Sequence, residues 1–151
     1  MLDRPTLATN PEDLERLFVE RVNAGDLDGA AALYEQEAVL ADPLGEPREG
    51  REAIRAALEP LIARGLRLAV EEELPTVRRG DLALTSTRGP GPGVRVQVAR
   101  RQPDGSWRRV IDMLEPGVQQ QDARPASGAS ARDGRSDPWR QRRLFQHTVR
   151  C

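Results

Sequence analysis

Two aspartates stand where a carboxylate could move a proton. Asp42 follows the apolar residues 38–41 and directly precedes a loop rich in proline and glycine. A general base needs an apolar substrate site on one side and a path to water on the other, and a strand end at a pocket mouth offers both. The other interpretation is that Asp42 only caps the loop by accepting backbone N–H bonds, because Asp-Pro sequences are common in turns.

Asp112 is the second candidate carboxylate. Alternation along the last expected strand places it on one face with Val110 and Leu114. An arginine on the neighbouring strand, Arg95, is a suitable partner. Such a pair could be a structural ion pair, could bind an anionic ligand, or could belong to an acid–base site, and the sequence leaves all three open. The opposite face would carry Trp107, Arg109, Ile111 and Met113.

The cysteine and histidine content limits the possible chemistry. The chain holds one cysteine, Cys151, and one histidine, His147, both near the end of the sequence. A single cysteine excludes an internal disulfide and a cysteine-based zinc cluster. A single histidine argues against a histidine-based triad or a multi-histidine metal site. We therefore expect neither a metal nor a cofactor.

Charge and hydropathy exclude further classes. Arginines number 23 and acidic residues 24, which gives a formal net charge of −1. The part before Gly117 is net acidic, which argues against a nucleic-acid partner. No apolar run approaches the roughly 20 residues of a spanning helix. The first residues also lack the basic-then-apolar pattern of a signal peptide. A cytoplasmic location without membrane contact is the expectation.

Helical spacing predicts three helices in the first half of the chain. The first begins with Asn10 as its cap, the second begins at Asp26, and the third opens at Gly50. Their apolar stripes recur every three or four residues, as in helices with one buried face. The stripes are Leu14, Leu17, Phe18 and Val22 in the first, Leu27, Ala31 and Leu33 or Tyr34 in the second, and Ile54, Leu58, Leu61 and Ile62 in the third.

The pattern changes to a period of two in the second half. Strands are expected at residues 38–41, 66–70, 82–87, 94–98 and 107–114, and the second of them could continue through a bulge at Pro75 to Arg78. Three helices followed by antiparallel strands imply an α+β fold with helices on one face of a curved sheet. Residues 10–117 would form this domain, residues 1–9 would be flexible, and residues 118–151 would be a disordered tail rich in Arg, Ser, Gly and Pro.

Several segments resemble one superfamily. They are Ala32-Leu33-Tyr34, residues 38–45, Gly50-Arg51-Glu52-Ala53-Ile54 and residues 100–112. Over residues 10–116 the chain is similar to nuclear transport factor two-like proteins, especially SnoaL-like and ketosteroid-isomerase-like members. The resemblance implies a cone-shaped curved antiparallel sheet packed on three N-terminal helices, with an apolar pocket at the open end. It also implies a homodimer through the convex sheet face, where it places Val94, Val96 and Val98.

The resemblance also implies roles for individual residues. Asp42 would be the base that shuttles a proton next to a carbonyl, Asp112 a second acid or base inside the cone, and Gln97 and Tyr34 hydrogen-bond donors. The ligand would be a small apolar or aromatic carbonyl compound. The pocket would be lined by Phe18, Val22, Leu40, Leu58, Arg95, Val110 and Leu114.

The chain departs from the isomerase pattern at its donor positions. Phe18 stands where a phenol would donate to the substrate oxygen, and Gln97 stands where a neutral carboxylic acid would. Loss of such a donor typically costs on the order of 100-fold in rate, so ketosteroid isomerase activity itself is not expected. The loop at residues 88–93 also shortens the strand pair beside the pocket.

Two functional hypotheses follow. The first is a small-molecule pocket protein that performs cofactor-free isomerisation, cyclisation or dehydration by proton transfer. The alternative is a non-catalytic module for ligand binding or dimerisation, because one fold of this kind hosts many functions.

Overall fold

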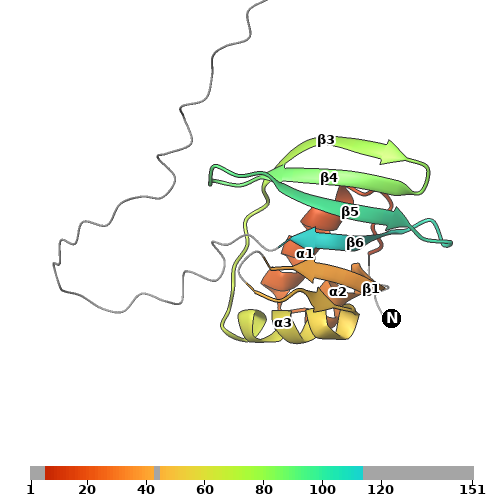
Figure 1. The fold of residues 1–151 in the computed structure, drawn as a ribbon. Coiled ribbons are helices and arrows are strands. Elements are labelled where there is room, and N and C mark those ends of the chain that lie inside the picture. Colours follow the sequence, from red (N-terminus) through yellow and green to blue (C-terminus); the bar gives the residue numbers. More distant parts are fainter. Residues whose placement is uncertain (1–5, 43–44, 114–151) are drawn as a thin grey trace, which may run out of the picture.

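The computed structural model describes residues 6–42 and 45–113, which form helices packed on one face of a curved sheet (Figure 1). The elements are α1 (Asp13–Ala24), α2 (Leu27–Ala32), β1 (Tyr34–Ala41), β2 (Arg48–Glu49), α3 (Arg51–Ala63), β3 (Glu72–Arg79), β4 (Leu82–Arg88), β5 (Arg95–Arg101) and β6 (Trp107–Met113). The α+β class is confirmed. The expected tail at residues 118–151 lies outside the described residues.

The sheet is mixed rather than antiparallel throughout. Its strand order is β2-β1-β6-β5-β4-β3. The strands β3 to β6 form an antiparallel meander, and the last of them lies beside β1 and runs parallel to it. The prediction of a purely antiparallel sheet was wrong at this pair, because the direction of a strand beside a distant partner depends on the whole path of the chain.

Helices α1 and α2 begin close to the predicted positions. Asp26 caps α2 as expected, since its carboxylate accepts the N–H of Gly29 at 2.8 Å. At α1 the cap is not Asn10. The carboxylate of Asp13 instead accepts the backbone N–H groups of Asn10 and Thr9, at 2.9 and 3.1 Å.

The N-terminal segment is tied to the domain more firmly than the sequence suggested. Of the nine residues expected to be flexible, residues 6–9 are described, and Ala8 is buried. Its carbonyl accepts the N–H of Trp107 at 2.8 Å, and Arg21 donates to the carbonyl of Thr6 at 2.5 Å. These are long-range contacts that local pattern cannot reveal.

The predicted strand at residues 66–70 is irregular backbone, and β3 begins only at Glu72. Leu66 and Leu68 still pack against the core, which explains the alternation. The amide of Asn23 on α1 pairs with both backbone groups of Leu68 at 2.8 Å, so a side chain takes the place of a neighbouring strand. The bulge predicted near Pro75 is present between Leu74 and Val77.

A second bulge lies in β6 and changes which side chains face inward. Val98 and Ala99 of β5 pair with Ile111 and Arg109, so Val110 is an extra residue in β6. We call the face that packs against α1 the inner face, and the opposite one the outer face. Because of the bulge, Arg109 and Asp112 both point inward. The prediction that Arg109 shares a face with Ile111 was therefore wrong.

Candidate functional site

A network of ionised and polar side chains fills the inner face between α1 and β6. Its centre is the guanidinium of Arg109, which is 1% exposed. Arg109 donates to Glu15 Oε2 at 2.5 Å and to Asp112 Oδ2 at 3.0 Å. Its guanidinium also lies 4.7 Å from the ring centre of Phe18, a cation–π distance. One helix and one strand are thus joined by a buried charge.

Tyr34 and Asp112 form the second part of the network. The Tyr34 hydroxyl donates to Asp112 Oδ2 at 2.7 Å and accepts from Arg109 at 3.1 Å. The other oxygen of Asp112 accepts the backbone N–H of Met113 at 2.8 Å. Since Arg109 can only donate, the direction of the phenol proton is fixed toward Asp112.

Arg95 closes the network from β5. Its guanidinium lies 3.1 Å from Glu15 Oε2 and 3.5 Å from Asp112 Oδ1, so the pairing of Arg95 with Asp112 expected from the sequence is present. The amide of Gln97 is best satisfied with its oxygen accepting from Arg95 at 2.8 Å and its nitrogen donating to Thr85 at 3.1 Å. Glu15, Asp112, Arg95 and Arg109 together carry no net charge.

The electrostatics of the network favour an ionised Asp112. Burial alone would raise the pKa of Asp112, but Arg109, Arg95 and the Tyr34 hydroxyl outweigh it and hold that pKa below its usual value of 3.8. Burial, together with the Asp112 carboxylate, raises the pKa of Tyr34. Burial opposes the charge of Arg109, but Asp112, Tyr34 and Glu15 raise its pKa overall. Asp112 is therefore a carboxylate and Tyr34 a phenol at neutral pH.

Asp42 lies apart from the centre of this network, directly after β1. Leu40, two residues earlier, pairs with Asp112 across the parallel ladder. The carbonyl of Asp42 accepts the N–H of Gly45 at 3.3 Å. The residue is half-buried. Of the four residues predicted to be catalytic, the structure thus joins Tyr34, Gln97 and Asp112, and places Asp42 at the strand end.

The predicted pocket residues have four different outcomes. Most of them are buried in the apolar core and pack against other side chains: Phe18, Val22, Leu40 and Leu58. Arg95 belongs to the charged network, and Val110 is the half-buried bulge residue. Leu114 lies outside the described residues.

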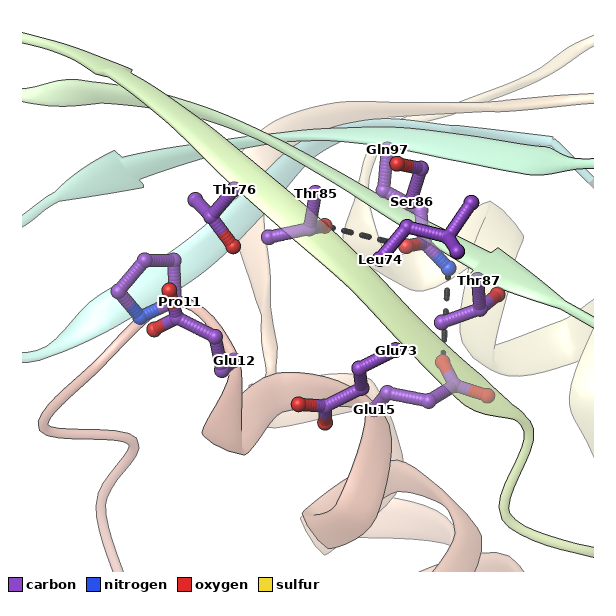
Figure 2. A pocket seen from close by; sticks show the side chains of 10 residues that line it. All are labelled: Pro11, Glu12, Glu15, Glu73, Leu74, Thr76, Thr85, Ser86, Thr87 and Gln97. Atoms are coloured by element: carbon purple, nitrogen blue, oxygen red, sulfur yellow. Dashed lines mark hydrogen bonds between the residues drawn. The ribbon is translucent and has the colours of Figure 1, made fainter.

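A small hollow opens on the inner face beside the network (Figure 2). It lies between the start of α1 and strands β3, β4 and β5, and its enclosed volume is about 10 Å³. This is room for about one water molecule. The residues that line it are Pro11, Glu12, Glu15, Glu73, Leu74, Thr76, Thr85, Ser86, Thr87 and Gln97.

Two members of the network were missed by the sequence analysis. Glu15 interrupts the apolar stripe of α1, three residues before Phe18 and seven before Val22, so helical spacing already placed a charge on the buried face. Arg109 could not be found in this way, because its inward direction depends on the Val110 bulge.

The outer face carries an apolar row that crosses five strands. The row consists of residues that pair across neighbouring strands, from β1 through β6, β5 and β4 to β3. In Figure 1 the sheet lies in front of α1 and α2, so this outer face is turned toward the viewer. Val77 is 64% exposed and Ile111 is 47% exposed. Val94 and Val96 are exposed on this face, as the resemblance implied. The row is Val39, Ile111, Val98, Leu84 and Val77.

None of the helices in the described part of the chain has the length and apolar character needed to cross a bilayer. Within residues 6–42 and 45–113, no group of three or more His, Cys, Asp or Glu side chains is arranged to hold a metal ion.

Solved structures with the same fold have low sequence identity to this chain. A ketosteroid isomerase-like protein from Erwinia carotovora atroseptica is 15% identical with a TM-score of 0.54, and covers 68% of this chain and 89% of its own. A nuclear transport factor two-like protein from Shewanella oneidensis is 20% identical with a TM-score of 0.54, and covers 68% of this chain and 93% of its own. These similarities support the fold alone.

The sequence comparisons add a family and a partial relative. The epoxide hydrolase LasB of Streptomyces lasalocidi is 49% identical over 57 residues, which are 37% of this chain and only 19% of that enzyme. The model of the SnoaL-like domain matches residues 15–115. That match spans both the helices and the sheet, and the chain belongs to the SnoaL-like domain family.

Proposed function

We propose that this SnoaL-like protein binds a small apolar ligand and moves a proton on it without a cofactor, as a homodimer in the cytoplasm. The observation that carries the proposal is the buried network of Glu15, Arg109, Asp112, Arg95 and Tyr34. Buried charges are costly even when they are paired, and clusters of strongly shifted groups are concentrated at functional sites.

Asp42 is the proton carrier in this proposal. It lies half-buried at the end of β1, two residues beyond Leu40, the ladder partner of Asp112. A carboxylate at such a position can face the ligand and still exchange protons with water.

In this proposal Asp112 is not a base; it holds other side chains in position. Its two oxygens accept from Tyr34, Arg109 and the Met113 backbone, and its low pKa makes it a weak proton acceptor. We propose that Asp112 and Arg109 are positioning residues that hold the phenol of Tyr34. Gln97, fixed between Arg95 and Thr85, would hold Arg95 in place in the same way.

The proposed substrates are carbonyl compounds or epoxides. Aromatic and polycyclic ketones follow from the isomerase-like resemblance, in which a base removes a proton beside the carbonyl. Epoxides follow from the match to the epoxide hydrolase of Streptomyces lasalocidi, although the matched segment is a fifth or less of that enzyme. The reactions of both substrate classes develop negative charge on an oxygen atom, so both would use hydrogen-bond donors near the base.

The homodimer is proposed to form through the outer face. The row from Val39 to Val77 leaves large apolar side chains in water, and an exposed apolar patch of this kind is typical of a protein interface. A second copy would bury the row without disturbing the inner network.

A non-catalytic binding or dimerisation module remains the second candidate. One observation favours it: the predicted pocket residues Phe18, Val22, Leu40 and Leu58 pack into the core. In that case the buried network would serve stability and fold specificity only.

A thermal-shift screen separates the two candidates. The purified protein would be tested against ketones, epoxides and matched alcohols. A ligand at about 100 times its dissociation constant adds roughly 2.7 kcal/mol of stability, which a melting curve detects. Stabilisation by one class, together with turnover that Asp42→Asn abolishes while binding persists, would support proton transfer. Turnover unchanged in Asp42→Asn would contradict the base assignment, and no response to any compound would favour the dimerisation module.

A further inference from the structure

The free edge of the sheet, β3, is acidic at its start and basic at its end. The strand reads Glu-Glu-Leu-Pro-Thr-Val-Arg-Arg. It is the last strand of the sheet, and within the described part of the chain only β4 pairs with it (Figure 1). The other side of β3 therefore offers its backbone N–H and C=O groups to a strand of another molecule.

A bulge at the centre of β3 brings the two halves of the strand onto matching faces. Leu74 and Val77 pair with Ser86 and Leu84 of β4, which are two residues apart and therefore lie on one face. That face is the outer one, because Val77 and Leu84 belong to the apolar row. In a regular strand, residues three apart such as Leu74 and Val77 would point to opposite faces. The extra residue between them removes this mismatch.

The charged ends of β3 follow the same arrangement. Glu73 and Arg78 have ladder partners in β4 that are each 2% exposed, so both point to the inner face. Their neighbours Glu72 and Arg79 therefore point to the outer face. Each face of β3 thus carries one glutamate near its start and one arginine near its end.

An antiparallel copy of β3 would match this arrangement on both faces. When the two bulges lie side by side, Arg79 of the second copy stands opposite Glu72, and Arg78 of the second copy stands opposite Glu73. Two-fold symmetry repeats both pairs at the other end of the contact. Opposite charges directly across a ladder attract, so all four pairs favour this register.

The centre of the contact is apolar on the outer face. Leu74 would lie opposite Val77 of the second copy, and the symmetric pair would cover Val77, which is 64% exposed. Pro75 has no N–H to offer a ladder, but it lies in the bulge, between the residues that would pair.

The same features reject other strands. Charged side chains, a proline and a bulge normally protect an edge strand from association. A parallel copy of β3 would place glutamate opposite glutamate and arginine opposite arginine, which is repulsive. An antiparallel copy shifted by one residue would set outward side chains against inward ones. Only the antiparallel copy centred on the bulge meets both requirements.

We propose that β3 pairs antiparallel with β3 of a second copy of this chain, so that two sheets join into one. The contact is separate from the outer-face dimer and goes beyond the proposed function, because it involves neither Asp42 nor the buried network. A contact along one strand edge is small, and small interfaces are typical of weak complexes, so we expect a dissociation constant of roughly 0.1–1 mM.

Amide NMR of the full chain over a range of protein concentrations tests this contact. The measurements use the Ile111→Asp variant as the parent, since its added charge disrupts the outer-face contact and leaves the β3 edge unchanged. We expect concentration-dependent shifts centred on residues 72–79. Failure of the outer-face dimer and failure of the β3 contact are then separate results.

Charge reversal in the parent identifies the register. Glu72→Arg and Arg79→Glu each turn two attractive pairs into repulsive ones, and each alone should weaken self-association roughly tenfold. The first variant carries arginine at both positions and the second carries glutamate at both. An equimolar mixture of the two should therefore associate at least as tightly as the parent, and the double variant should again associate with itself. Arg78 is left unchanged, because it pairs with Glu12 of its own chain at 2.8 Å.

Two control variants make the same changes of charge elsewhere. Glu59→Arg on α3 and Arg48→Glu on β2 alter exposed residues away from β3 and should leave the association unchanged. Shifts that are absent from residues 72–79, equal losses in the control variants, or a mixture that fails to recover association would each overturn the proposal.

Discussion

Arg109 and Asp112 lie three residues apart on one strand, and their side chains meet at 3.0 Å inside the domain. In a regular strand, residues three apart point to opposite faces. The extra residue Val110 shifts the alternation by one, so both side chains turn inward. A local irregularity in β6 thus creates the central ion pair of the network.

Removing the Arg109 charge should destabilise the protein strongly. Arg109→Leu leaves the carboxylates of Glu15 and Asp112 buried with only Arg95 to compensate them. Breaking a buried ion pair from one side costs about 3–5 kcal/mol. The free energy of unfolding, measured in urea, should fall by that amount.

Arg100→Leu is the matched control. Arg100 pairs with Glu35 at 3.3 Å on the exposed face, where such a pair contributes about 0–1 kcal/mol. Equal losses in Arg109→Leu and Arg100→Leu would contradict the central role of Arg109.

The ionised state of Asp112 should make the protein sensitive to acid. Its pKa in the folded state lies below the ordinary 3.8, so its carboxylate contributes stability that is fully present above that value and is lost as the pH falls through the folded pKa. The urea midpoint should therefore drop steeply below about pH 4. This drop should be shallower in Asp112→Asn, and Asp81→Asn, at an exposed turn, should retain the wild-type slope.

The carboxyl carbon of Asp112 offers a direct check that needs no variant. Its NMR chemical shift should still report an ionised group at pH 3.8. A midpoint of titration at or above that pH would show that the arginines do not outweigh burial.

The phenol of Tyr34 should contribute measurably to the network. Tyr34→Phe removes the donor to Asp112 and the acceptor for Arg109, and keeps the ring that packs 6.1 Å from Phe18. Losing hydrogen bonds to charged partners costs about 1.5–3 kcal/mol. Unfolding in urea would show this loss, and an unchanged midpoint would mean that water replaces the hydroxyl without cost.

The bulge itself can be tested by deletion. Without Val110, Arg109 and Asp112 would stand two residues apart in a regular strand and would still share the inner face. We expect the deletion variant to keep cooperative thermal unfolding by circular dichroism, because the network can still form. Val110→Ala keeps the extra residue and should cost about 1 kcal/mol. Loss of cooperative unfolding in the deletion variant alone would show that the fold needs the bulge itself.

The outer face should control the oligomeric state. Ile111→Asp places a charge in the middle of the apolar row and should convert a dimer to a monomer in sedimentation velocity. Leu7→Asp alters a similarly exposed apolar residue that is not in this row, and should leave the dimer intact. A wild-type monomer at high concentration would remove the dimer from the proposed function.

Much of the fold followed from local sequence. The apolar stripe of α1, the Asp26 cap of α2 and the bulge near Pro75 all follow from residue spacing and turn residues. These features depend on neighbours within a few positions, so the sequence alone determined them. Membership of the SnoaL-like family also followed, because its motifs are short and contiguous.

Tertiary structure decided the content of the inner face. Glu15, Tyr34, Arg95 and Arg109 come from four elements that are far apart in the chain, and their meeting depends on the return of β6 beside β1. The inward turn of Arg109 depends on a bulge that is defined only by pairing with β5. Such features arise from long-range register and leave no local pattern in the sequence, so only the folded chain shows that these charged groups meet on the inner face.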